Sequence, residues 1–352
     1  MACQPVTSHA LRVTSVILSC VVLALTFWGG LQLDLPLARF LRSMHLPWLE
    51  LAGDVGSRLG SGAVLAGISG ALLAIGLVSK QPWFRRAGLE SLIAHAAVAL
   101  TTQALKHLIG RPRPRMTHGG GFQFGPSWDT GLDSFPSGHA AASFAVAAVL
   151  ARRFPRAGWF LYGAASVVAL SRVMRGSHFP TDVLAGVGLG LVAGYVVANP
   201  VRAWRSSLVN ALHDMAPYLV GAFALLWTAM HAAPDRWLNA IMFSVGACAV
   251  VVGAGHRLSR SLGVYRASGW SEGVRPWAAS LVAFGLALTT ASWLVMTLTV
   301  LLVIARWLEE RGSGQSPGKS PPMHSLAEVT LAVGLVVALV AIQSVKGVLP
   351  LL

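Results

Sequence analysis

Long apolar runs that carry almost no charge dominate this sequence of 352 residues. The first three runs span residues 11–33, 63–78 and 89–106. Hydrophobic residues make up 55% of the chain and charged residues only 11%, a balance that excludes an ordinary soluble domain. A helix that crosses a bilayer needs about 20 predominantly apolar residues. The sequence therefore predicts an all-α, polytopic integral membrane protein.

Three more apolar runs, at 137–151, 159–174 and 181–197, complete a bundle of six expected helices in residues 1–200. Residues 34–60 have amphipathic spacing and predict a short helix lying at the outer surface of the membrane. Beyond residue 200, apolar runs continue at 216–232, 237–255, 277–305 and 327–344. The run 277–305 predicts one tilted helix or a tight hairpin. We expect residues 201–352 to form an additional C-terminal transmembrane domain.

Three short polar clusters interrupt the apolar sequence between residues 106 and 182. They contain, in order, Lys106 and Arg113; Ser137, Gly138 and His139; and Arg172, His178 and Asp182. Arginine offers phosphate oxygens a planar fork of donors, and lysine adds a point charge. The Pro-Ser-Gly stretch precedes an apolar run and predicts a helix N-terminus, where an anion is favoured. Together the clusters predict a phosphate-binding site.

The two histidines of these clusters differ in their sequence neighbours. Pro180 fits the first turn of a helix, which places Asp182 in that turn and within reach of His178. A carboxylate that holds one imidazole nitrogen fixes the tautomer and frees the other nitrogen to attack. This pattern predicts His178 as the nucleophile and Asp182 as its orienting carboxylate. His139 remains as the proton donor to the leaving oxygen.

The clusters read Lys-(six residues)-Arg-Pro, Pro-Ser-Gly-His and Ser-Arg-(five residues)-His-(three residues)-Asp. This order and spacing resembles the type 2 phosphatidic acid phosphatase superfamily, over residues 10–200 of the chain. The resemblance implies a membrane-embedded lipid phosphatase in which His178 becomes a phosphohistidine, with no metal or other cofactor. It implies that the phosphoryl oxygens are held by Lys106, Arg113, Ser137, Gly138 and Arg172. Arg111 also precedes a proline, but only Arg113 has the family spacing from Lys106.

The resemblance also implies a class of substrate, a lipid that carries a terminal phosphate or pyrophosphate. The candidates are undecaprenyl pyrophosphate, phosphatidylglycerol phosphate, phosphatidic acid and phosphates of the lipid A type. Two other functions remain open on the sequence. One is a lipid phosphotransferase that uses the same phosphohistidine, and the other is a non-enzymatic membrane transporter or scaffold. The presence of both histidines and of Asp182 argues against the second.

The distribution of basic residues predicts an orientation in the membrane. The polar clusters fall at one face of the expected bundle, and the basic loops 80–86, 152–156 and 201–205 fall at the other. Cytoplasmic loops carry an excess of Lys and Arg. We therefore expect a bacterial inner-membrane protein whose active site faces the periplasm.

Charge and cysteine content bear on which partners and cofactors the protein can have. The formal net charge of +14 is scattered between apolar runs and does not indicate nucleic-acid binding. The three cysteines have no partners at metal-ligand spacing and predict neither disulfides nor a zinc site. Residues 201–352 contain no catalytic constellation, so we expect them to serve as a scaffold, as part of a lipid groove or in a homo-oligomer.

Overall fold

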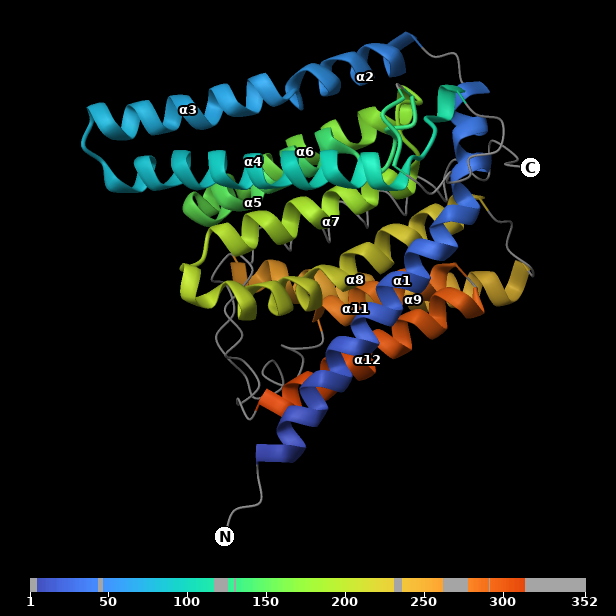
Figure 1. Cartoon of the computed structure of the whole chain (residues 1–352). Helices are drawn as coiled ribbons and strands as arrows, with labels where there is room; N and C mark the ends of the chain where they lie inside the picture. Colours follow the sequence, from blue (N-terminus) through green and yellow to red (C-terminus); the bar gives the residue numbers. More distant parts are fainter. Residues whose placement is uncertain are drawn as a thin grey trace. The chain divides into compact units, whose positions relative to one another are not determined.

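The computed structural model describes residues 5–43, 47–116, 126–129, 131–230, 236–261, 278–290 and 292–313, and the regular structure of these residues is helical (Figure 1). Four helices are long and apolar enough to cross a membrane: His9–Arg39, Pro82–Ile109, Pro155–Met174 and Pro180–Val197. A bent pair, Gly53–Leu59 and Gly62–Val78, would make a fifth span. The prediction of an all-α polytopic membrane protein is confirmed.

The chain forms two compact units. One contains Leu31–Ala211, and the other combines Met1–Gly30 with Leu212–Leu352. Helix α1 (Pro5–Ser43) and helix α8 (Trp204–Met230) each contribute residues to both units. We call the first the motif unit, because it contains all three polar clusters, and the second the terminal unit. The domain boundary expected at residue 200 stays a prediction.

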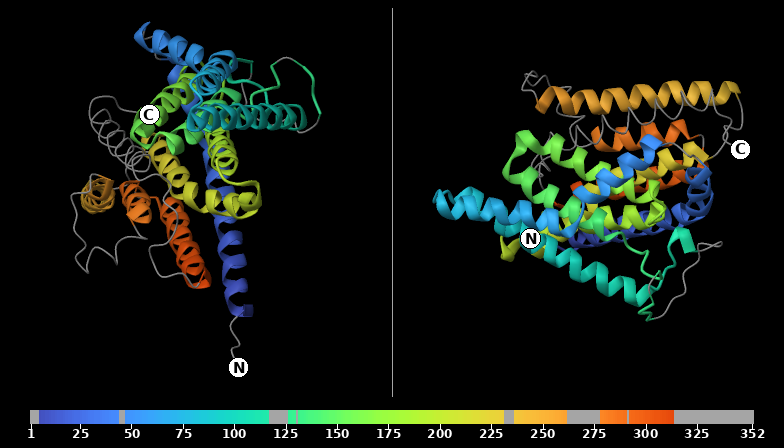
Figure 2. Two further views of the ribbon diagram at one scale, coloured as in Figure 1. Left: turned by 90° about the vertical axis from the view of Figure 1, so that its left-hand side faces the viewer. Right: turned by 90° about the horizontal axis from the view of Figure 1, so that it is seen from above.

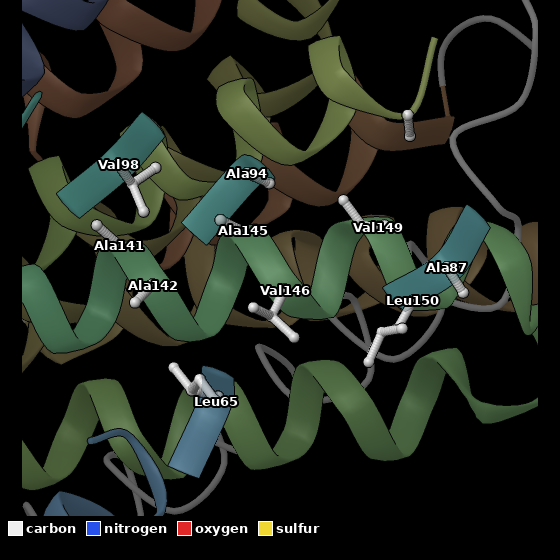
Figure 3. Close-up of a cluster of buried hydrophobic side chains, with 11 residues drawn as sticks. Leu65, Ala87, Ala94, Val98, Ala141, Ala142, Ala145, Val146, Val149 and Leu150 are labelled. Carbon is white, nitrogen blue, oxygen red and sulfur yellow. The ribbon is translucent and has the colours of Figure 1, made fainter. Parts of the chain in front are cut away.

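The motif unit is built around one short helix, α5 (Gly138–Arg153), whose middle is buried. Its other helices are α2 (Pro47–Leu59), α3 (Gly62–Val78), α4 (Pro82–Ile109), α6 (Gly158–Met174) and α7 (Pro180–Val197). Helix α5 packs against α4, α6 and α7, and every residue of 140–151 is buried. Leu65 of α3 and Val98 of α4 pack against the small side chains of α5 (Figure 3). The helix that begins with the Pro-Ser-Gly-His cluster is therefore held on several sides.

Helices α5 and α7 approach at backbone distance because α7 presents glycines to α5. A Cβ atom added to Gly186, Gly190 or Gly194 would lie 2.4–2.6 Å from a backbone oxygen of α5 or of its N-cap residue. Small residues allow this close approach between helices in a membrane. The contact begins at the N-terminal ends of both helices, so it brings the second polar cluster next to the third.

The N-terminal part of the motif unit differs from the prediction. Helix α1 continues through Asp34 to Ser43, so the helix expected over 34–60 does not begin at residue 34. The carboxylate of Asp34 is buried and has polar partners inside the unit, which removes the reason to end the helix there. A separate helix, α2, follows and packs on α6.

The terminal unit contains α9 (Arg236–Ser261), α11 (Ala278–Thr289) and α12 (Trp293–Ser313). The run 277–305 is therefore divided between two helices, which matches the hairpin alternative. Helices α9 and α11 lie side by side in both views of Figure 2. The span predicted at 327–344 lies outside the described residues.

Candidate active site

The three polar clusters meet at one end of the motif unit, because each lies at a helix terminus. Lys106 is in the last turn of α4, Ser137 is the N-cap of α5, and Arg172 is in the last turn of α6. Asp182 lies in the first turn of α7. Gly110, with φ of 60°, ends α4 in the left-handed conformation and turns the chain toward the site.

The basic loops meet at the opposite end of the same unit. Trp83, at the start of α4, lies 5.5 Å from Phe154, at the end of α5, between ring centroids. Arg152 Nη2 donates to Asn199 Oδ1 at 2.7 Å, which joins the end of α5 to the end of α7. The clusters and the basic loops are thus separated by the length of the helices.

His178 is buried and its ring orientation is fixed. Its Nδ1 lies 2.7 Å from the backbone oxygen of Ser134, and a carbonyl only accepts, so Nδ1 carries the proton. Burial lowers the pKa of His178 well below its ordinary value, and the positive charges of Arg172 and Lys106 act in the same direction. A lowered pKa favours the neutral ring, and the hydrogen bond that the described residues make to this ring is at Nδ1, not at Nε2. An unprotonated Nε2 is what an attacking imidazole needs.

Asp182 acts on His178 less directly than the sequence suggested. Its Oδ2 lies 3.9 Å from His178 Nδ1, beyond hydrogen-bond distance. The same oxygen accepts hydrogen bonds from Ser134 Oγ at 2.6 Å and from the backbone N–H of Phe179 at 2.8 Å. Ser134 therefore links the two residues, with its carbonyl on the imidazole and its hydroxyl on the carboxylate.

A buried charge network, absent from the sequence prediction, supports Asp182. Arg111 Nη1 donates to Asp182 Oδ1 at 2.5 Å, and Arg111 Nη2 donates to Asp34 Oδ2 at 2.7 Å. The Arg111 side chain is 1% exposed, and its guanidinium lies 4.3 Å from the centroid of the Phe179 ring. Thr181 donates to Asp34 twice, through its backbone N–H, which is 3.0 Å from Oδ1, and through its hydroxyl, which bonds Oδ2. The oxygen of the same hydroxyl accepts a hydrogen bond from Arg111 Nη1 at 2.9 Å.

One sequence signal pointed to this network. Asp34 is a lone carboxylate at the end of an apolar run, and ionisable groups at membrane depth usually pair with one another. The partner was not evident, because Arg111 lies 77 residues away in the sequence.

Lys106 and Arg113 form a more open layer of cations above this network. Both contact Asp133: Arg113 binds it through two hydrogen bonds of 2.7 and 2.5 Å, and Lys106 Nζ lies 3.8 Å from Oδ2. The side chains of Arg113 and Asp133 are 34% and 32% exposed. Burial tends to raise the pKa of Asp133, but the hydrogen bonds and charge of Arg113, helped by Lys106, outweigh it and lower that pKa.

Two donors at the site have no hydrogen-bond partner in the part of the chain that the structure describes. The hydroxyl of Ser137 and the Nε of Arg172 are buried and unbonded within the described part of the chain. Arg172 is anchored by Nη1, which donates to Ser57 Oγ at 2.6 Å. A Cβ on Gly138 would make one ordinary van der Waals contact, with Thr102 Oγ1 at 3.7 Å.

His139 is half-buried, and no described residue hydrogen-bonds to its ring. The charges of Arg172, Lys106 and Arg113 all act on it, which puts it near the same cations as His178. The structure thus gathers the eight predicted site residues at one end of the unit. Within the described ranges, no three His, Cys, Asp or Glu side chains form a group suited to a metal ion.

Comparison with known proteins agrees with this geometry. Residues 87–206 match the model of the PAP2 superfamily. The lipid A 1-phosphatase of Rhizobium johnstonii is 41% identical over 140 residues, which are 39% of this chain and 48% of the relative. No solved structure matches the chain.

Relatives with other named activities also match part of the chain. The decaprenylphosphoryl-5-phosphoribose phosphatase of Mycobacterium tuberculosis is 33% identical over 35% of this chain and 64% of its own length. The phosphatidylglycerophosphatase B of Bacillus subtilis is 32% identical over 31% of this chain and 56% of its own length. The chain covers less than half of the length of the lipid A 1-phosphatases that it matches. Residues 87–206, which contain the three motifs that converge on one site, are thus similar to the PAP2 superfamily.

Proposed function

We propose that this protein hydrolyses the terminal phosphate of a membrane lipid phosphate or pyrophosphate through a phosphohistidine on His178. The observation that carries the proposal is the geometry of His178, whose Nδ1 is held by the Ser134 carbonyl while no described residue hydrogen-bonds to its Nε2. Unsatisfied donors of Ser137 and Arg172 lie at the same end of the unit. A neutral nucleophile beside unused anion-binding donors is suited to phosphoryl transfer.

The steps follow from the positions of the side chains. Lys106, Arg113, Arg172, Ser137 and the backbone at Gly138 bind the phosphoryl oxygens. Nε2 of His178 attacks phosphorus, and the bond to the leaving oxygen breaks as His139 donates a proton to that oxygen. Water then attacks the phosphorus of the phosphohistidine as His139 takes up a proton from that water. The bond between phosphorus and His178 Nε2 breaks, and inorganic phosphate leaves. Asp182 stabilises the positive imidazole through Ser134 and through its own negative charge.

The substrate class comes from the relatives and from the position of the site. The site lies at the end of a bundle of membrane helices, so a headgroup can enter it while an apolar tail stays in lipid. The relatives named above act on lipid phosphates of several kinds, and we propose lipid A type phosphates as the first candidate because the identity is 41% there.

Phosphate release from a panel of purified lipids tests this proposal. The panel contains a lipid A 1-phosphate, phosphatidylglycerol phosphate, phosphatidic acid and undecaprenyl pyrophosphate, presented to the purified full chain in detergent micelles. We expect release from at least one lipid, with a transient acid-labile phosphoprotein that is absent in His178→Ala. Release without any dependence on His178 would contradict the mechanism, and phosphate found on an acceptor lipid would indicate a phosphotransferase.

We also propose that the site faces the periplasm, because the basic loops lie at the opposite end of the unit. In a variant without its native cysteines, Asp129→Cys should react with a membrane-impermeant thiol reagent in spheroplasts. Gln81→Cys should react only after the membrane is permeabilised. The reverse labelling pattern would place the site in the cytoplasm.

A further inference from the structure

Asp133 is a carboxylate bound to two of the cations that the proposed reaction assigns to phosphate. Its two oxygens meet Arg113 at 2.7 and 2.5 Å in the parallel geometry that guanidinium also forms with phosphate. One of these oxygens lies 3.8 Å from Lys106 Nζ. In the structure, Asp133 therefore satisfies Arg113 and Lys106 in the way that two oxygens of a phosphoryl group would.

The backbone holds Asp133 at this place. The N–H of Arg113 donates to the carbonyl of Gly131 at 2.9 Å, and the N–H of Ser134 donates to the carbonyl of Arg111 at 2.9 Å. Residues 131–134 thus run beside 111–113. Asp133 turns its side chain to the outer cations, and the next residue, Ser134, serves His178 and Asp182.

Exposure distinguishes this ion pair from the inner one. Arg113 and Asp133 are 34% and 32% exposed, whereas Arg111 and its partner Asp182 are 1% and 0% exposed. Water screens an exposed pair, and such pairs contribute about 0–1 kcal/mol in most proteins. The Asp133 contact can therefore exchange with a ligand, while the Arg111 contact is a fixed part of the fold.

We propose that Asp133 is an internal competitor for the phosphate subsite, which a substrate must displace from Arg113 and Lys106. This proposal rests on the proposed function and adds a determinant of specificity to it. We assume that phosphate binds only to molecules in which Asp133 has left the two cations. The apparent Kd for any anion is then the intrinsic Kd divided by the fraction of such molecules. A terminal phosphate carries two charges, and its attraction to the cations compensates for the cost of displacing Asp133. An ordinary phosphodiester lipid carries one charge, so its binding energy from the cations is smaller. Asp133 would thus keep abundant diester headgroups off the site and would favour release of inorganic phosphate.

Equilibrium binding of radiolabelled inorganic phosphate to the detergent-purified full chain tests the proposal. Asp133→Asn keeps the shape of the side chain and removes its charge. Asp129→Asn is the matched control, because this substitution removes the same charge from the same loop. Among the described residues, the Asp129 carboxylate contacts only Ser127. We expect the Kd for phosphate to fall about three- to tenfold in Asp133→Asn and to stay within about twofold of the wild type in Asp129→Asn.

The opposite result has a clear meaning. If Asp133 instead positions Arg113 for the ligand, Asp133→Asn will bind phosphate as weakly as the wild type or more weakly, and the proposal is overturned. Asp133→Ser provides a second variant should Asp133→Asn not fold, with the same direction expected. An equal gain in phosphate affinity in Asp129→Asn would also overturn the proposal. The gain would then come from the lower negative charge of the loop and not from the contact of Asp133 with the cations.

This binding experiment is independent of turnover. Lipid hydrolysis by the wild type is measured separately on the panel described above. If no lipid is hydrolysed while Asp133→Asn still gains affinity for phosphate, the proposed function fails and the competitor role stands. If hydrolysis is found and the gain is absent, the competitor role fails alone.

Discussion

The two units of this molecule bury different kinds of polar group. The motif unit buries ionisable side chains, namely Asp34, Arg111, Arg172, His178 and Asp182. Among the described residues of the terminal unit, the buried polar side chains are hydroxyls of Ser and Thr. Thr26, Thr228 and Thr299 each donate to the carbonyl four residues earlier in the same helix.

The physical reason for the difference is the requirement for partners. A hydroxyl in a helix satisfies itself with a neighbouring carbonyl, so it can be buried without any tertiary design. A buried charge costs several kcal/mol unless another element brings a partner, as α1 brings Asp34 to Arg111. Buried charges at membrane depth therefore mark a functional site, and buried hydroxyls do not.

The two units nevertheless share one packing device. In the motif unit, a Cβ on Gly190 would lie 2.4 Å from the carbonyl oxygen of Ala141. In the terminal unit, a Cβ on Gly285 would lie 2.5 Å from the carbonyl oxygen of Gly246. Close helix packing thus occurs in both units, and among the described residues its combination with buried charged side chains is found at the site.

The largest expected effect is on catalysis. His178→Ala removes the nucleophile and should lower phosphate release by about 10⁴-fold or more. His139→Ala should cost about 10²- to 10⁴-fold and prolong the phosphoenzyme. Thr299→Val, in the terminal unit, should keep near wild-type turnover because the hydroxyl it removes bonds only its own helix. Steady-state assays on the best lipid of the panel measure all three, and near wild-type rates in His178→Ala would refute the covalent mechanism.

The next effect is on stability. Arg111→Ala leaves Asp34 and Asp182 as buried charges without their cation, which should cost about 3–5 kcal/mol of folding free energy. Arg113→Ala should lose less than about 1 kcal/mol and should raise KM instead, because its partner is half-exposed. Arg311→Ala, which removes an exposed guanidinium 3.9 Å from the Trp307 ring, is the control in the terminal unit.

Thermal melting in detergent, together with KM, separates these variants. The spacing of the first motif led us to expect the larger role for Arg113, and the structure divides the roles between the two arginines. Equal melting temperatures for Arg111→Ala and Arg113→Ala would contradict that division.

A smaller effect tests the shared packing device. Gly190→Val and Gly285→Val both force helices apart and should each cost about 1–3 kcal/mol. Only Gly190→Val should also lower the turnover of the protein that remains folded, because it shifts α7 against α5. Gly67→Val and Gly255→Val are matched controls, since a Cβ at either position meets nothing within 4 Å. Comparable loss of turnover in Gly190→Val and Gly285→Val would show that helix packing in the two units matters equally for catalysis.

The smallest expected effect is that of pH on His178. A histidine with the ordinary pKa of 6.5 would lose about tenfold of its neutral form between pH 7.5 and 5.5. Because the pKa of His178 is well below that value, we expect its neutral fraction to fall less than about twofold over this range. The ring nitrogens can be followed by NMR of the ¹⁵N-histidine-labelled protein, with the signal assigned by His178→Gln. A titration midpoint near 6.5 would contradict the buried, cation-flanked setting.

Much of the fold was predictable because hydrophobic length and motif spacing are local properties. The apolar runs located helices α3, α5, α6 and α7 within two residues, whereas α4 begins at Pro82, seven residues before the run 89–106. The hairpin of α11 and α12 was one of two alternatives. The predicted start of the second helix, at residue 34, was wrong because the first apolar run was taken to end at Asp34. The charge of Asp34 is neutralised by Arg111, which lies far along the chain.

The sequence by itself determined the membrane class and the three motifs, and the motifs carried the resemblance to a phosphatase family. It also separated His178 from His139 by their neighbours. Only the tertiary structure decided that Ser134 holds the His178 ring, that Arg111 is fixed between two carboxylates, and that Asp133 occupies the outer cations. These contacts join residues that are 20 to 77 positions apart in the sequence. Spacing along one helix cannot reveal such pairs, because the close packing of α5 on α7 and the path of the chain after α4 bring them together.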